Sequence, residues 1–129
     1  FIFQKHFFPN IAEMNPEEID VAKALDENKK IKYWIRNLER QPNYAFWLQT
    51  STDKFYPDFV AELNDGRMLV VEHKGMDRYS DDDSKEKRTL GMLWASLSKG
   101  KCLFVMTRLK DAKNRNIKQQ IEDVIDGVY

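Results

Sequence analysis

Residues 55–75, FYPDFVAELNDGRMLVVEHKG, constrain the fold of this chain more than any other stretch. Apolar, β-branched and aromatic residues lie on both sides of an Asn-Asp-Gly turn signal at 64–66, a pattern that predicts a β-hairpin. Asp58 lies in the first predicted strand, and Glu72 and Lys74 lie near the end of the second. We therefore expect the rest of the chain to support this hairpin.

The length of the turn decides whether the two acids meet. If 64–66 form a three-residue loop, the register places Asp58 directly opposite Glu72, with Cβ atoms about 4.5–5.5 Å apart. Lys74 then points to the same face, because side chains alternate along a strand. A two-residue Asp-Gly loop would instead pair Asp58 with His73 and put the acids on opposite faces. The sequence allows both registers.

Two facing carboxylates repel each other unless a cation offsets their charge. Hard divalent ions such as Mg²⁺ take one or two carboxylates together with waters and phosphate oxygens, which is what Asp58 and Glu72 offer. Such an ion polarises a phosphate and lowers the pKa of a bound water, and Lys74 could hold or deprotonate that water. The alternative is a cross-strand salt bridge on an exposed sheet face, which contributes about 0–1 kcal/mol. Val60 and Val70 on the same strands argue against an exposed face.

Helix and strand signals surround the hairpin. Asn15, Pro16 and the acids that follow them mark a helix that runs to about residue 27. Further along the chain we predict strands at 31–38 and 44–48, an acidic loop at 76–84, a helix at 85–98, a strand at 101–107 and a helix at 113–125.

The resulting order, α-β-β-β-β-α-β-α, predicts an α/β fold with a mixed central sheet of about five strands flanked by helices. Residues 1–15 show no sustained periodicity, and we interpret them as an extended lead-in from a missing upstream region. Residues 16–129 then form a single domain.

Composition limits the classes of partner. The chain has 129 residues with 21 Lys+Arg and 21 Asp+Glu, so any surface that attracts nucleic acid must be local. The single cysteine, Cys102, excludes an internal disulfide framework and fits a reducing, cytoplasmic compartment. No apolar run approaches the roughly 20 residues of a membrane span, which predicts no membrane partner.

Pro57-Asp58, thirteen intervening residues and then Glu72-His73-Lys74 resemble the PD-(D/E)xK motif of the restriction-endonuclease-like nucleases. That family's common core also has an acid-bearing helix upstream, the motif on two adjoining strands, and a helix and a strand afterwards. A longer pattern resembles the C-terminal endonuclease domain of type III restriction enzyme Res subunits and related helicase-nuclease proteins. This pattern covers most of the chain up to residue 75, in the segments 7–9, 18–26, 33–37, 55–59, 65–67 and 72–75, with a weaker echo at Lys87, Gly91 and Trp94.

The resemblance implies a phosphodiesterase that depends on Mg²⁺, with Mn²⁺ as a possible substitute. Asp58 and Glu72 would bind the metal, the main-chain carbonyl of His73 would add a ligand, and Lys74 would be the catalytic lysine. Glu18 matches the first-helix acid that often completes such metal sites. The imidazole of His73 should point to the other face of the sheet, and we do not assign it a catalytic role.

Further candidates flank this set. Glu17 is the alternative first-helix acid, although an acid at a helix N-terminus also stabilises the helix dipole without binding any ligand. Arg36 and Asn37 could contact DNA backbone phosphates, or they could simply end a strand. Lys87 and Arg88 open the helix after the motif. The resemblance implies that this helix lies near the substrate, so both could bind DNA, and a solvated helix face explains them equally well.

The leading hypothesis is an endonuclease domain that cleaves DNA with Mg²⁺. From the resemblance alone, we expect a helicase or ATPase region upstream in the same polypeptide, and a homodimer or a modification subunit as a possible partner. The alternative is a nuclease-fold module that binds DNA or assists assembly without cutting. The presence of Asp58, Glu72 and Lys74 together argues against that alternative.

Overall fold

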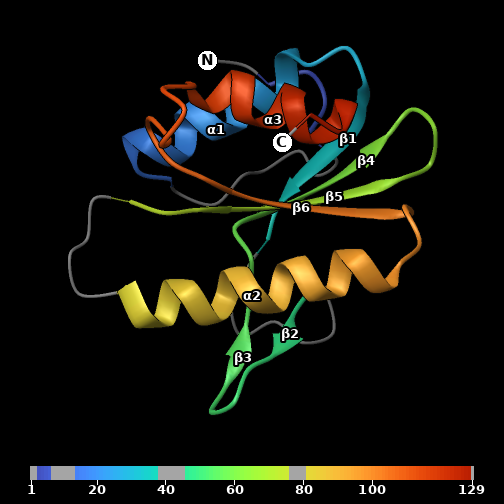
Figure 1. The fold of residues 1–129 in the computed structure, drawn as a ribbon. Coiled ribbons are helices and arrows are strands. Elements are labelled where there is room, and N and C mark those ends of the chain that lie inside the picture. Colours follow the sequence, from blue (N-terminus) through green and yellow to red (C-terminus); the bar gives the residue numbers. More distant parts are fainter. Residues whose placement is uncertain (1–2, 7–13, 38–45, 76–80, 129) are drawn as a thin grey trace.

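The computed structural model describes residues 3–6, 14–37, 46–75 and 81–128. Its centre is a mixed four-stranded sheet with the order β1-β4-β5-β6 (Figure 1). These strands and the helices around them are α1 (Pro16–Glu27), β1 (Ile31–Arg36), β4 (Phe59–Leu63), β5 (Met68–His73), α2 (Asp81–Leu97), β6 (Cys102–Thr107) and α3 (Ile117–Asp126). The strands β1, β4 and β5 are antiparallel neighbours, whereas β6 pairs with β5 in parallel and α2 connects the two.

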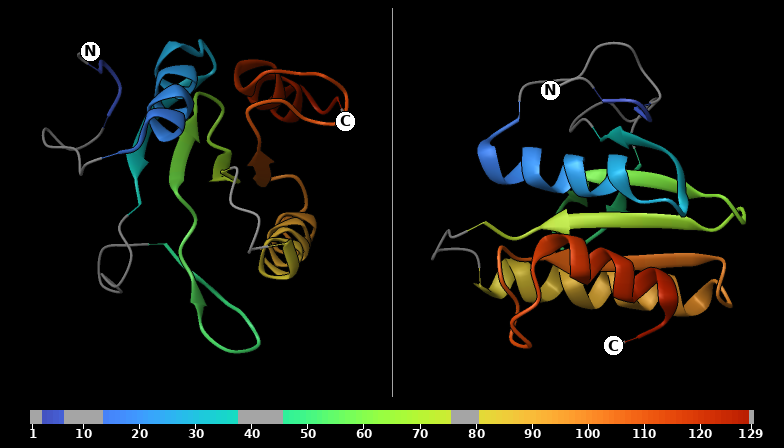
Figure 2. Two further views of the ribbon diagram at one scale, coloured as in Figure 1. Left: turned by 90° about the vertical axis from the view of Figure 1, so that its left-hand side faces the viewer. Right: turned by 90° about the horizontal axis from the view of Figure 1, so that it is seen from above.

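Helices cover both faces of the sheet (Figures 1 and 2). On one face, α1 and α3 enclose the larger core, whose buried side chains include Leu25, Trp34, Phe59, Val71 and Ile121. The other face is covered by α2, and the predicted α/β class with helices on a mixed sheet is confirmed.

The smaller core lies between α2 and the sheet. Phe55, Val70 and Phe104 are its buried members, and Leu90 and Trp94 of α2 pack against them. The alternation of side chains along β5 explains this division, because Val70 faces α2 while its neighbours Leu69 and Val71 face α1 and α3.

The hairpin has the register of the three-residue loop. The amide of Leu63 donates to the carbonyl of Arg67 at 2.8 Å, and Gly66 adopts a φ of 91°, in the left-handed region that glycine tolerates. Phe59 accordingly pairs with Val71. The alternative two-residue loop is therefore excluded.

Local capping fixes the first helix. The side chain of Asn15 accepts a hydrogen bond from the amide of Glu18, and Glu18 in return accepts one from the amide of Asn15, with Pro16 at the first helical position. This reciprocal capping box satisfies amides that the helix itself leaves unpaired. The predicted start and end of this helix are both confirmed.

Residues 44 and 45 of the segment predicted as a second sheet strand, 44–48, lie outside the described ranges, and its described part does not join the central sheet. Leu48–Gln49 forms the strand β2, which pairs with β3 (Lys54–Phe55) in a separate two-stranded sheet that projects beyond α2 (Figure 1). The outer edge of β1 is instead taken by the lead-in, where Trp34 donates its amide to the carbonyl of Lys5 at 3.1 Å. The prediction of about five strands was thus wrong, and the central sheet has four.

Two predicted helix boundaries also differ. Helix α2 begins at Asp81 and not at residue 85, so the acidic run that we predicted to be a loop is the first turn of a helix, where acidic residues are favoured. Helix α3 begins at Ile117 and not at residue 113, because Asn116 is its N-cap. The predicted strand at 101–107 is confirmed as β6.

The described part of the lead-in, residues 3–6, docks on α1 and β1. The carboxylate of Asp26 accepts hydrogen bonds from the amides of Gln4 and Lys5, at 3.0 and 2.7 Å, and from the indole of Trp34 at 3.0 Å. Residues 7–13 lie outside the described ranges. Among the helices that are described, none combines the length and the apolar character that a membrane crossing requires.

Candidate functional site

Asp58 and Glu72 lie opposite each other where the hairpin strands end. The amide of Asp58 donates to Oε1 of Glu72 at 3.1 Å, and the amide of His73 donates to Oδ2 of Asp58 at 2.8 Å. Both carboxyl side chains are mostly buried, with 21% and 13% of their surface exposed. This is the pairing that the three-residue turn predicts.

Burial raises the pKa of both acids, and the charge of Asp58 adds to the effect at Glu72. Burial, and then the charge of nearby Asp58, raise the pKa of Glu72 to about 9. Burial also raises the pKa of Asp58, although the hydrogen bond from the amide of His73 opposes this change. The Lys87 ammonium, 3.9 Å from Oε2 of Glu72, lowers the pKa of Glu72 without cancelling the increase. The positive charge near Glu72 is therefore too small to bring the pKa of its carboxyl back to the usual range.

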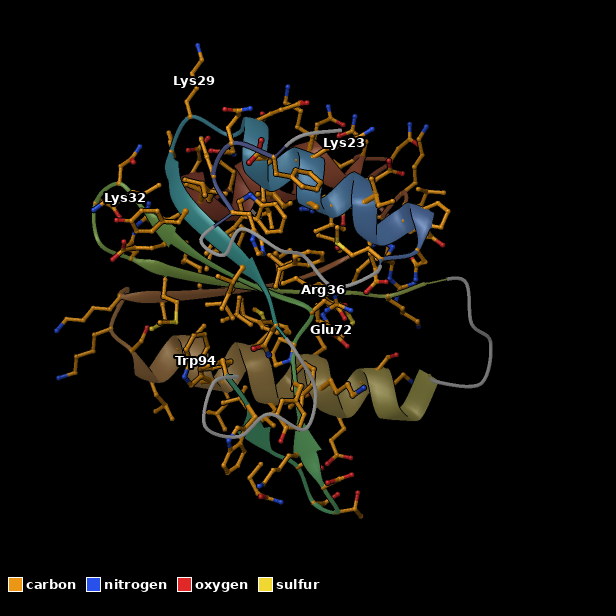
Figure 3. The ribbon with its side chains drawn as sticks, turned by 180° about the vertical axis from the view of Figure 1, so that it is seen from behind. Lys23, Lys29, Lys32, Arg36, Glu72 and Trp94 are labelled. Atoms are coloured by element: carbon orange, nitrogen blue, oxygen red, sulfur yellow. The ribbon has the colours of Figure 1, made fainter. Side chains whose placement is uncertain are left out.

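Arg36 is drawn into the site from the end of β1. Its guanidinium donates to Oε2 of Glu18 at 2.6 Å and to the main-chain carbonyl of Asp58 at 2.8 Å, and it lies 3.5 Å from Oδ1 of Asp58. Figure 3 shows Arg36 and Glu72 on the same part of the sheet, between α1 and α2. The sequence suggested that Arg36 contacts phosphates, whereas in the structure it connects the first-helix acid to the hairpin acid.

The two first-helix acids have different partners. Glu18 is divided between the capping box and Arg36, so it reaches Asp58 only through the guanidinium. Glu17 lies beside the imidazole of His73, and its Oε1, an acceptor, is 2.9 Å from Nε2. Within the described ranges, no three His, Cys, Asp or Glu side chains converge as a ready-made metal site.

The imidazole of His73 is buried on the face of the sheet that α1 covers. Its imidazole is 3% exposed and lies between Glu17 and the hydroxyl of Thr107, which is 2.9 Å from Nδ1. The predicted direction of this side chain, away from the face of Glu72, is confirmed. Sequence reasoning missed the Glu17 and Thr107 contacts, although alternation along β5 already places His73 on the face that α1 covers.

Lys74 and Asn37 occupy structural positions beside the acids. The amide of Lys74 donates to the carbonyl of Thr107 at 2.8 Å and continues the β5–β6 ladder past the end of the strand. The amide side chain of Asn37 donates to the carbonyls of Phe46 and Pro57, at 2.7 and 2.9 Å, and accepts from the amide of Phe46 at 2.9 Å. Asn37 is 2% exposed, so it holds the chain next to Asp58 and has no surface to offer to DNA.

The two remaining candidates, Lys87 and Arg88, face different parts of the molecule. Lys87 points toward Glu72 and lies over the ring of Phe55, 5.4 Å from its centroid. Arg88, the next residue, is exposed and faces a different hollow of the molecule. The structure therefore brings Lys87 to the acids and leaves Arg88 away from them.

No protein-family model, curated protein or solved structure matches this chain. What the site can do must accordingly be argued from its own donors. Asp58 and Glu72 supply two carboxyl groups. The main-chain carbonyl of His73, the residue between Glu72 and Lys74, lies next to them. Mg²⁺ needs one or two carboxylates and completes its shell with waters and phosphate oxygens, so this donor set fits the ion.

Proposed function

We propose that this domain is a metal-dependent endonuclease that hydrolyses DNA phosphodiester bonds with Mg²⁺ or Mn²⁺. The observation that carries the proposal is the pairing of Asp58 with Glu72 at the buried end of the hairpin, with Lys74 two residues further along the chain. A simple structural salt bridge does not account for two adjacent acids that both have a raised pKa.

The arrangement of elements supports the same proposal. An acid-bearing helix comes first and three antiparallel strands of the central sheet follow, with Asp58 directly before β4 and Glu72 in β5. A crossover helix then leads to a parallel fourth strand. This is the order expected from the resemblance to the restriction-endonuclease-like core. The finer proposal, a cleavage module of a type III restriction-type helicase-nuclease with a motor upstream, rests on the sequence resemblance.

Each residue has a distinct role in the proposed reaction. Asp58 and Glu72 would hold the cation, which when bound would polarise the scissile phosphate and lower the pKa of a bound water. The ammonium of Lys74 orients that water or neutralises charge that develops on the phosphate. Arg36 fixes the orientation of Asp58 through the main-chain carbonyl.

A cleavage assay with matched variants tests this function. We expect supercoiled plasmid to be nicked in Mg²⁺ or Mn²⁺ by the wild type, and the rate to fall by about 10²-fold or more in Asp58→Asn, Glu72→Gln and Lys74→Met. Glu62→Gln is the control, since Glu62 is an exposed acid of the same hairpin that lies 4.0 Å from Lys32. Equal cleavage by all four variants would contradict the assignment.

Metal binding provides a test that does not require turnover. Calorimetric titration with Mn²⁺ should detect a site in the wild type and in Glu62→Gln, and a much weaker one in Asp58→Asn and Glu72→Gln. This measurement matters because a domain that works with a motor can need that motor in order to cut. Absence of a divalent-ion site in the wild type would overturn the proposal.

A further inference from the structure

A second hollow, of about 690 Å³, lies between α2, β6 and the connection from β6 to α3. Figure 2 shows α2 and α3 on either side of β6, which is the edge strand of the sheet. The lining combines apolar side chains, among them Met92, Phe104 and Val124, with a concentration of positive charge. None of the candidate acids belongs to it.

The charge of this lining is unusual for the chain. Five basic residues and one acid line the hollow, namely Arg88, Arg108, Lys110, Lys113, Arg115 and Asp111. Lys+Arg and Asp+Glu are equal in number over the whole sequence, so this excess of bases is a local feature. A local basic surface on a neutral protein is the electrostatic footprint of a polyanion site.

Four of the five bases are available to a ligand. Arg115 is paired with Asp111 and Asp123, at 2.7 and 3.0 Å. The other four, Arg88, Arg108, Lys110 and Lys113, make no ion pair within the described part of the chain.

The segment 108–115, which forms the rim of the hollow and carries all the bases except Arg88, is held by hydrogen bonds. Gln120 is 4% exposed, and its side chain donates to the carbonyls of Arg108 and Arg115 at 2.7 and 2.9 Å while accepting from the amide of Arg108 at 2.9 Å. Asp111 also accepts from the amides of Lys113 and Arg115, at 3.0 and 2.8 Å. A rim ordered by its own hydrogen bonds loses little conformational entropy when a ligand binds.

The lining of the hollow reaches the end of the sheet that bears the candidate acids. Met106 lines it and is the partner of Glu72 in the parallel β5–β6 pair, and Arg108 follows two residues later. The ends of β5 and β6 lie side by side, so a chain molecule bound at Arg108 would pass close to Glu72.

We propose that this hollow docks single-stranded nucleic acid. Its phosphates would lie on the basic rim, and a base would lie against the apolar floor, which Met92, Phe104 and Val124 form. In a duplex the bases are stacked inside and cannot reach a concave apolar floor, whereas an unpaired strand can turn a base into it. The claim that the docked strand is the substrate rests on the proposed nuclease function. The claim of binding does not.

Binding can be measured without cleavage by fluorescence anisotropy in EDTA, with a labelled single-stranded oligonucleotide and a duplex of the same sequence. We expect the single strand to bind more tightly, and Arg108→Gln/Lys110→Gln to weaken it about tenfold while making the salt slope shallower by about 0.7 per lost phosphate contact. The matched control is Lys29→Gln/Lys32→Gln, which removes the same charge near β1, at the opposite edge of the sheet (Figure 3).

Three results would overturn the proposal: an equal loss of affinity in both double variants, duplex binding as tight as single-strand binding, or no binding of either at low salt. The Asp58→Asn variant separates this proposal from the nuclease assignment, because it should lose cleavage and keep strand binding. If the wild type binds single strands at this hollow but neither cuts DNA nor binds metal, docking stands and the nuclease assignment fails.

Discussion

The amide of Asp58 donates a hydrogen bond to the carboxyl of Glu72, so the two acids of the hairpin are in direct contact in a largely buried setting. Burial of the Glu72 carboxyl away from water, and then the charge of Asp58 beside it, raise the pKa of Glu72 to about 9. Such a site attracts cations, and its buried acids lower the stability of the metal-free protein.

We therefore expect the metal-free protein to lose stability as the pH rises between 4.5 and about 9. Glu72 titrates near 4.5 in the unfolded chain and near 9 in the folded chain, so folding takes up a proton in this interval. Glu72→Gln removes that uptake, and the free energy of unfolding should depend less on pH. Urea unfolding at about pH 5 and about pH 8 in EDTA measures the difference.

Mg²⁺ should reverse this dependence. The ion binds the ionised carboxyls, so it should raise the melting temperature of the wild type more at about pH 8 than at about pH 5 and should leave Glu72→Gln almost unchanged. Parallel pH profiles for the wild type and Glu72→Gln would contradict the assignment of a raised pKa.

Arg36→Gln should destabilise the protein by about 1–3 kcal/mol, because it removes the charged donor that Glu18 and Asp58 share. Its side chain is 18% exposed, which places the expected cost below that of breaking a fully buried ion pair. Lys32→Gln is the control, since Lys32 is 53% exposed and lies 4.0 Å from Glu62. Chemical denaturation should leave that variant within about 1 kcal/mol of the wild type. Equal effects of the two substitutions would show that Arg36 does not hold the acids.

Gly91→Ala should destabilise the protein by about 1–3 kcal/mol, although alanine favours a helix over glycine by about 1 kcal/mol. A Cβ at this position would lie 2.5 Å from three ring atoms of Phe104, which is buried under α2. Thermal or urea unfolding measures the change. Adding Phe104→Leu should make Gly91→Ala less costly than it is in the wild-type background, and a Gly91→Ala variant more stable than the wild type would contradict the close approach of α2 to β6.

Asp26→Asn should cost about 1.5–3 kcal/mol at neutral pH and almost nothing in acid. Burial would raise the pKa of Asp26, but hydrogen bonds from Gln4, Trp34 and Lys5 outweigh it and lower the pKa below 3.8. The contribution of the carboxylate is present above 3.8 and is lost as the pH falls through the lower, folded value. Urea unfolding should show the wild type and Asp26→Asn converging at low pH, whereas Asp20→Asn, an exposed acid on the same helix, should match the wild type throughout.

Local signals made much of the fold predictable. Asn15 and Pro16 marked the start of α1, because helix capping depends on neighbouring residues. Gly66 fitted both possible registers of the hairpin, and the structure shows the three-residue loop. The pairing of Asp58 with Glu72 followed from the register by counting.

Long-range contacts were not predictable in the same way. Sequence reasoning left Arg36 and Asn37 either as contacts to DNA phosphates or as residues that end a strand. Arg36 instead pairs with Glu18, and Asn37 holds Phe46 and Pro57. The two-stranded β2–β3 sheet was missed because the outer edge of β1 is occupied by the lead-in, and nothing near 44–48 signals that.

His73 takes the middle position of the Glu72-His73-Lys74 run. Its imidazole contacts Glu17 and Thr107, while its main-chain amide donates to the carboxylate of Asp58. One residue therefore connects α1 to the hairpin acids, beside the link that Arg36 makes from Glu18. Replacing the imidazole would remove a contact of α1 with the sheet and would leave in place the amide that holds Asp58.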